Sequence, residues 1–342
     1  MATEQPAREK STILADEDDP WTGPVRYRAE YHDDWDGCIE GPEPSHQHSK
    51  FTVSSQPGVL EVIRRWRCVS GVKALDTPRK ELPQRAAGRP GPSRIRIHSP
   101  RLINALRAVV QYYPGQELTG ETVEFEEPFR FLVHHRKELE RYKFNHPPQH
   151  DETYRTLCNE EIDVLLGELE KLMGKAIRAE EERHKNGLAT FENLWMIFKP
   201  GEKLFLKDLE VDRVMSFLLS EIRGGTVQGK EQRYRLSLWN VRYDGLRFRR
   251  DKDPRIVIKP FEGEKEIIGL RVYPQSYHKD SEEDLRAHEG RSLAQQMIVR
   301  GKKYWDLRKP CLKEFHGACI APKRLPKVLS FTLLKNKPKP RI

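Results

Sequence analysis

The sequence lacks the long hydrophobic runs and the paired cysteines that mark membrane and secreted proteins. No stretch of about 18 apolar residues occurs in its 342 residues, so we predict no membrane span. The first residues are polar and contain no apolar signal core, which argues against secretion. Five cysteines are an odd number, which argues against a disulfide framework. We therefore expect an intracellular protein, cytoplasmic or nuclear.

Apolar residues are also scarce. They make up 37% of the chain against about 45–50% (glycine included) in average proteins, whereas charged residues reach 33% against about 25%. The net charge of +9 is uneven, because residues 1–48 hold twelve acidic and four basic residues, and the remainder then carries +17. A basic remainder suits nucleic acid as a partner, although solvated surface lysines and arginines are the plainer explanation.

Both ends of the chain have compositions typical of poorly ordered segments. Residues 1–94 combine an acidic segment with a linker rich in proline, glycine and arginine, and such a segment cannot bury enough apolar surface to offset its ordering entropy. Within it, residues 59–69 have the apolar content for one strand or a short helix. Residues 321–342 hold seven basic residues, four prolines and no acid, which predicts a basic flexible tail. We expect one domain over residues 95–320.

The first part of that domain has helical patterns over residues 99–185. Ile95 and Ile97 alternate with polar residues, which indicates a short strand. Ser99 and Pro100 then have the residue types of an N-cap and a first helical position. A second helix is predicted to open at residues 128–129.

A third helix is predicted over residues 152–185 and ends at residues 186–187, an Asn-Gly pair. Its apolar stripe consists of Ile162, Leu165, Leu166, Leu169, Leu172, Met173 and Ile177. This stripe is too short for a coiled coil, so we expect it to pack on its own domain. The almost wholly charged end, residues 178–185, is expected to project into solvent.

From Ala189 the hydrophobic period changes to two, which predicts strands. They are expected over residues 191–198, 203–207, 213–222, 234–243, 246–249, 255–258 and 267–272. An Asp-Gly pair at residues 244–245 indicates a hairpin turn. A last helix is expected over residues 282–307, bent near Gly290. The predicted fold class is α+β: an N-terminal helical part (99–185) plus a small antiparallel β-barrel or sandwich (189–273), with disordered termini.

One segment has the spacing of a phosphate-binding loop. Gly224 and Gly229 are followed by Lys230, as in G-x-x-x-x-G-K. The next position needs a hydroxyl to bind Mg²⁺, but Glu231 stands there, and a strand pattern follows where a helix is required. We therefore interpret the segment as a hairpin loop in which glycine permits positive φ.

Other candidate groups are incomplete. Cys311, His316 and Cys319 have part of a zinc-ligand spacing, but no second Cys/His pair lies near them in the sequence, so incidental placement is favoured. His134 and His135 have no nucleophile partner pattern, and we interpret them as packed or solvated. The pair at residues 277–278, Tyr-His, is read as structural. The sequence thus predicts no catalytic residue, no cofactor site and no metal site.

Aromatic residues on predicted strands have two readings. Trp195, Phe198 and Trp239 stand near Lys199 and other basic residues, an arrangement that can stack nucleic-acid bases. A barrel core also needs large apolar side chains, and core packing is the favoured reading.

Several short motifs occur in an order that resembles a known family. In the second half they are FENLWMIFKPG at 191–201, Trp239, FEGEKEI at 261–267, VYP at 272–274 and RGKKYWDL at 300–307. IHSP at 97–100, YPG at 113–115 and HR at 135–136 precede them. Over residues 95–319 the chain resembles the domain of unknown function that precedes the ATPase core of fungal AAA+ family ATPase-like proteins.

This resemblance implies a role beside a motor. The ATPase core with its Walker motifs would follow the domain, and residues 323–342 do not resemble such a continuation, so we expect a fragmentary or truncated member. The chain itself is expected not to be an enzyme but a non-catalytic region that engages a protein partner or client, and it would form an oligomer only with an ATPase core. Two alternatives are a nucleic-acid-binding module and an ATP-hydrolysing protein whose core is missing.

Overall fold

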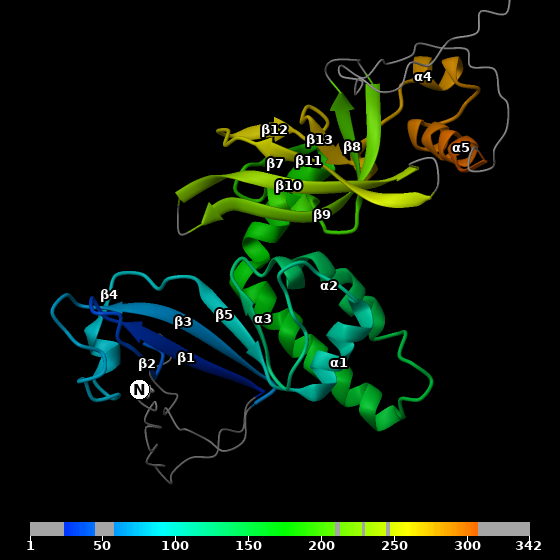
Figure 1. The fold of residues 1–342 in the computed structure, drawn as a ribbon. Coiled ribbons are helices and arrows are strands. Elements are labelled where there is room, and N and C mark those ends of the chain that lie inside the picture. Colours follow the sequence, from blue (N-terminus) through cyan, green and yellow to red (C-terminus); the bar gives the residue numbers. More distant parts are fainter. Residues whose placement is uncertain (1–23, 45–57, 209–212, 228–229, 244–246, 307–342) are drawn as a thin grey trace, which may run out of the picture.

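The computed structural model describes residues 24–44, 58–208, 213–227, 230–243 and 247–306. The described residues form a six-stranded and a five-stranded sheet and a separate two-stranded pair. In Figure 1 the first sheet lies beside a group of helices, and the second lies beyond the C-terminal end of the longest helix. Mixed helix and sheet confirm the α+β class.

The six-stranded sheet is built from the N-terminal third of the chain. Its strands are β1 (Val25–His32), β2 (Cys38–Gly41), β3 (Leu60–Cys68), β4 (Ala86–Ala87), β5 (Ser93–Ile97) and β6 (Val123–Glu126). Their order is β2-β1-β3-β5-β6, with β4 also beside β3, and a short helix η1 (Leu82–Arg85) precedes β4. β1 and β3 run parallel, whereas the other pairs are antiparallel.

Residues 24–44 and 58–94 contain strands of this sheet, so the expectation that residues 1–94 are disordered is wrong for them. These residues include the expected linker. The strand β1 has the sequence VRYRAEYH, in which charged residues make the segment look polar. These charged residues are ordered in the sheet because they pair with residues on other strands. Arg28, for example, lies 2.7 Å from Glu40 on β2. Residues 1–23, and the basic tail predicted at 321–342, lie outside the described residues.

Three helices cover the apolar face of this sheet. They are α1 (Pro100–Val109), α2 (Arg130–Tyr142) and α3 (Glu152–Lys185). The predicted start of α1 is confirmed, because the Ser99 side chain accepts a hydrogen bond from the Leu102 N–H at 3.3 Å and Pro100 follows it. The bounds of α3 are also confirmed, with Asp151 as N-cap and Gly187 at φ +76° after its end.

The charged face of α3 does not lie wholly in solvent. Glu161, Glu168 and Glu180 are buried, and each joins the helix to another element. Glu180 accepts hydrogen bonds from the Thr190 backbone N–H at 2.8 Å and from its hydroxyl at 3.0 Å. The expectation that residues 178–185 project into solvent is wrong at this position, because β7 folds back on the helix. The apolar stripe packs on its own domain as predicted.

The second sheet follows α3. Its strands are β8 (Lys203–Asp208), β9 (Arg213–Val227), β10 (Lys230–Tyr243), β11 (Phe248–Ile258) and β13 (Val272–Pro274), all antiparallel in the order β11-β10-β9-β8-β13. β7 (Leu188–Thr190) and β12 (Glu264–Glu266) form a separate pair. Because β11 and β13 are unpaired edges of the described sheet, this sheet is open, and the predicted barrel or sandwich is not found.

Several local assignments also change. Residues 194–197 form a short helix, η2 (Leu194–Ile197), in place of the predicted strand, and one strand, β11, replaces the two expected over 246–258. A further short helix, η3 (Gln275–Tyr277), follows β13, and the last predicted helix is α4 (Glu282–Ala287) and α5 (Leu293–Asp306), with the break near Gly290 as expected. The Asp-Gly turn at 244–245 lies outside the described residues.

One apolar core extends through both sheets. It joins Leu60 and Phe125 of the first sheet, Ile162 and Leu169 of α3, and Leu236 of the second sheet. In the part of the chain that the structure describes, no helix combines the length and the apolar character needed to cross a membrane. The two sheets and α3 therefore share one interior, which positions the cleft between them.

Candidate functional site

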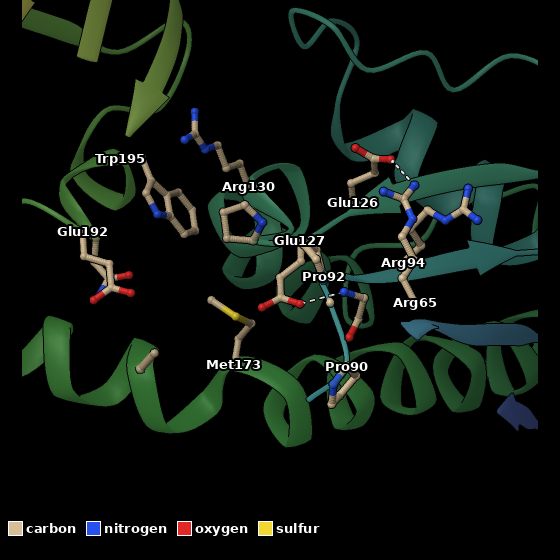
Figure 2. Close-up of a pocket in the computed structure, with 15 residues that line it drawn as sticks. Arg65, Pro90, Pro92, Arg94, Glu126, Glu127, Arg130, Met173, Glu192 and Trp195 are labelled. Carbon is tan, nitrogen blue, oxygen red and sulfur yellow. Dashed lines mark hydrogen bonds and ion pairs between the residues drawn. The ribbon is translucent and has the colours of Figure 1, made fainter. Parts of the chain in front are cut away.

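A cleft of about 800 Å³ lies where the six-stranded sheet, α2, α3 and η2 meet (Figure 2). This size falls within the roughly 300–1,000 Å³ of ligand sites in proteins. Apolar side chains line part of it: Pro90, Pro92, Pro128, Met173, Ala176 and Trp195. Charged residues of both signs, including Arg65, Arg94, Glu126, Glu127 and Glu192, line the rest.

Arg130 is the cationic group deepest in the fold on this lining. Its Nη2 donates to the Gly224 carbonyl oxygen at 2.6 Å, and its guanidinium carbon lies 5.7 Å from the Trp195 ring centroid and 5.9 Å from that of Tyr234. Burial lowers the pKa of Arg130, although the guanidinium stays charged at neutral pH. Among the described residues, no carboxylate lies within ion-pair distance of it. The cleft therefore contains a positive charge that carbonyl oxygens and ring faces stabilise.

The backbone before Arg130 is unusual. Phe129 has φ +55° and ψ +40°, a left-handed conformation that costs of order 1–3 kcal/mol for a residue with a side chain. Its ring is buried in the core, which holds the residue there. This conformation starts α2 without a side-chain cap and directs Arg130 toward the second sheet.

His134 and His135 are buried, which agrees with their interpretation from the sequence as packed histidines. His134 Nε2 lies 2.9 Å from the Trp195 carbonyl oxygen, which can only accept, so this nitrogen carries the proton. Its Nδ1 then accepts from the Tyr113 hydroxyl at 2.8 Å. Burial lowers the pKa of His134 to about 3, and burial followed by the charge of Lys199 lowers that of His135 to about 4. Both rings are neutral at pH 7.

The glycine segment lies on a strand pair. Gly224 and Gly225 belong to β9 with φ +89° and +94°, and Lys230 begins β10, paired with Val227. The strand expected after the loop is confirmed, so no helix N-terminus faces it. A β-carbon at Gly224 would lie 2.2 Å from the Arg233 carbonyl oxygen, which explains why glycine is required.

Of the aromatic candidates, Trp195 and Phe198 are buried, which confirms core packing for them. Trp239 differs, because it is half-buried on β10 on the side that alternates with buried Leu236 and Leu238. The guanidinium of Arg250 lies 4.1 Å from its ring centroid.

Arginines surround Trp239 on the same side of the sheet. Arg223 is directly opposite Arg235, and Arg255 is opposite Ser237. Arg223, Arg235, Arg250 and Arg255 are all exposed. We call the surface formed by Trp239 and these four arginines the basic face.

The remaining sequence candidates do not join a site. Tyr277 closes η3, and His278 Nδ1 lies 3.0 Å from the Tyr273 hydroxyl, so His278 has a structural contact with β13. Cys311, His316 and Cys319 lie outside the described residues. The sequence shows no sign of the cleft or of the place of Arg130 in it. The cleft forms only where distant segments of the chain meet: residues 90–94, 126–130, 173–176 and 192–195.

Comparison with known proteins gives one match. Residues 179–279 match the family model described as a domain of unknown function (DUF7025). This region runs from the end of α3 through the second sheet and η3. No curated protein and no solved structure matches the chain.

Proposed function

We propose that the chain is a non-catalytic interaction module, the region of an AAA+ ATPase-like protein that engages a client polypeptide. The link to an AAA+ motor comes from the resemblance over residues 95–319, part of which is the matched domain of unknown function. The cleft beside Arg130 carries the proposal. Its apolar floor suits an aliphatic or aromatic side chain of an extended segment, and its paired charges suit the flanking backbone and polar groups.

A substitution that fills the cleft tests this proposal. Peptides selected from a random display library on the full chain are expected to bind at least about tenfold more weakly to Ala176→Trp, because the indole occupies the space between Met173 and Trp195. Ala179→Trp is the matched control, since Ala179 is exposed on α3 and does not line the cleft. Fluorescence anisotropy of labelled peptides gives both affinities. Equal binding to the wild-type chain and to Ala176→Trp would refute the proposal.

The basic face supports a second candidate function, binding of single-stranded nucleic acid. The half-buried ring of Trp239 is a candidate stacking platform, and four arginines on one sheet face offer contacts to phosphates. Among the β9 residues that pair with β10, Glu221 is the one acidic residue, and it forms an ion pair with Arg223 at 2.6 Å.

For this candidate we expect a labelled single-stranded oligonucleotide to bind at low salt, with affinity falling steeply as salt rises. Trp239→Ala is expected to weaken binding by about 1–3 kcal/mol, or roughly 5- to 150-fold, through lost stacking. Arg235→Glu should also weaken it, whereas Lys175→Glu makes the same change of charge on exposed α3 and should have little effect. Absence of binding at low salt removes the candidate.

A further inference from the structure

Three metal-ligating side chains meet on the first sheet, at the end of β1 and the start of β2. Glu30 and His32 are two residues apart on β1, so both side chains point to the same face of the sheet. Cys38 begins β2 and lies directly opposite His32 in the antiparallel register. One ligand atom from each of the three lies within 4.8 Å of the others.

The separations of these atoms fit a tetrahedral zinc ion. Cys38 Sγ lies 3.7 Å from His32 Nε2, and His32 Nε2 lies 3.6 Å from Glu30 Oε2. With Zn–S near 2.3 Å and Zn–N or Zn–O near 2.0–2.2 Å, tetrahedral angles place ligand atoms about 3.4–3.6 Å apart. Small side-chain rotations therefore bring the three groups to bonding distance. One sulfur, one nitrogen and one oxygen ligand leave a fourth position open to water.

The turn between the two strands is held rigidly, so the ligands are arranged before any ion binds. The Asp33 carboxylate accepts hydrogen bonds from three backbone N–H groups, those of Trp35 at 2.9 Å, Gly37 at 2.7 Å and Ala74 at 2.8 Å. A β-carbon at Gly37 would lie 2.4 Å from Asp33 Oδ2, so glycine is required there. This turn fixes His32 and Cys38 opposite each other.

Arg94 and Arg65 both form ion pairs with the buried Glu30 and oppose a cation there. Arg94 pairs with Oε1 of Glu30, whereas Oε2 faces His32. Arg65 Nε lies 3.6 Å from Oε2, beyond hydrogen-bonding distance. When Cys38 binds zinc its thiol proton passes to solvent, so the thiolate adds a negative charge beside the ion. His32 and Cys38 are both solvent-accessible, which gives the ion a path of entry.

We propose that Glu30, His32 and Cys38 form a zinc site that joins β1 to the edge strand β2. The choice of zinc follows from the ligand set, since thiolate and imidazole together select a borderline-soft ion over magnesium or calcium. The inference does not depend on the proposed function. It assigns a role to a polar hairpin at the edge of the sheet.

Cobalt substitution on the full chain tests the proposal. We expect the metal-free protein to bind one equivalent of Co²⁺ with the sulfur-to-cobalt charge-transfer absorption of a thiolate complex, and Zn²⁺ to displace it. Cys38→Ser is expected to abolish this absorption, and His32→Ala to weaken Co²⁺ binding at least about tenfold.

Two controls separate this site from others in the chain. The double variant Cys311→Ser/Cys319→Ser and the exposed-histidine variant His288→Ala should retain the full absorption. Absence of a thiolate–cobalt band in the wild-type chain would overturn the proposal. So would a band that survives Cys38→Ser, because the metal would then be bound by other cysteines.

Discussion

Replacing Glu61 by glutamine is expected to lower the free energy of unfolding by about 3–5 kcal/mol, because it removes the buried carboxylate that four basic side chains share. The Glu61 side chain is 3% exposed at the centre of the polar face of the first sheet. Arg26 and Arg28 approach it from β1 at 3.4 and 3.2 Å. Arg96 and His98 approach it from β5 and the residue after it at 3.3 and 3.2 Å.

Glu124→Gln is the matched control for this substitution. Glu124 stands on the same face and pairs with Arg96 at 2.6 Å, but its side chain is 39% exposed. Exposed ion pairs contribute about 0–1 kcal/mol, so the control should unfold at nearly the wild-type denaturant midpoint. Urea unfolding followed by circular dichroism measures both. A Glu61→Gln chain no less stable than Glu124→Gln would show that the buried cations are balanced in another way.

The pH range in which Glu61 contributes follows from its pKa. Burial alone would raise the pKa, but the contact with His98 and the charges of Arg28 and Arg96 outweigh it and lower the value from 4.5 to about 2. A carboxyl whose pKa is lower in the folded state stabilises that state above its unfolded pKa. The contribution of Glu61 is therefore complete above pH 4.5 and is lost as pH falls toward 2.

These charges also explain why the sequence concealed the first sheet. A strand with one face in the core shows alternating apolar and polar residues, yet β1 and β3 contain arginine and glutamate in rows that look like a solvated segment. Several of these charges have partners on strands distant in sequence, as in the pair of Arg94 and Glu30. Pairing between distant segments cannot be read from local composition, so before Arg94 only residues 59–69, where β3 lies, had the pattern of a possible strand or short helix.

The helices were predictable because their signals are local. The cap at Ser99 and the glycine after the end of α3 lie within a few residues of the boundaries that they define, and the apolar stripe lies within α3 itself. The second sheet was predictable as strands but not as an open sheet, since closure depends on which edges pair. The cleft could not be predicted, because it forms only in the tertiary structure. In the sequence Arg130 is one of several arginines in a predicted helix, and its direction depends on the conformation of Phe129 and on the contact with Gly224.

Lowering the pH from 7 to 5 is expected to destabilise the fold by about 2 kcal/mol through His134 alone. Its pKa is about 3 in the folded chain against 6.5 as a model value, because burial disfavours the imidazolium. Below pH 6.5 the unfolded chain therefore takes up a proton that the folded chain does not. Each pH unit in this window costs about 1.4 kcal/mol, and His135, with a pKa of about 4, acts in the same direction. The contribution of Glu61 is lost below pH 4.5, so it changes little between pH 7 and 5.

The variant His134→Gln isolates this effect, because an amide can donate to the Trp195 carbonyl oxygen and accept from Tyr113 without titrating. Between pH 6 and 5 its stability should fall by about 1.4 kcal/mol less per pH unit than that of the wild-type chain. Tyr113→Phe is the control, since it removes one hydrogen bond but keeps the buried imidazole, so overall stability falls and the pH slope remains. Urea midpoints at pH 7, 6 and 5 give the slopes. If His134→Gln and the wild-type chain show the same slope, His134 is protonated in the folded state and the burial argument fails.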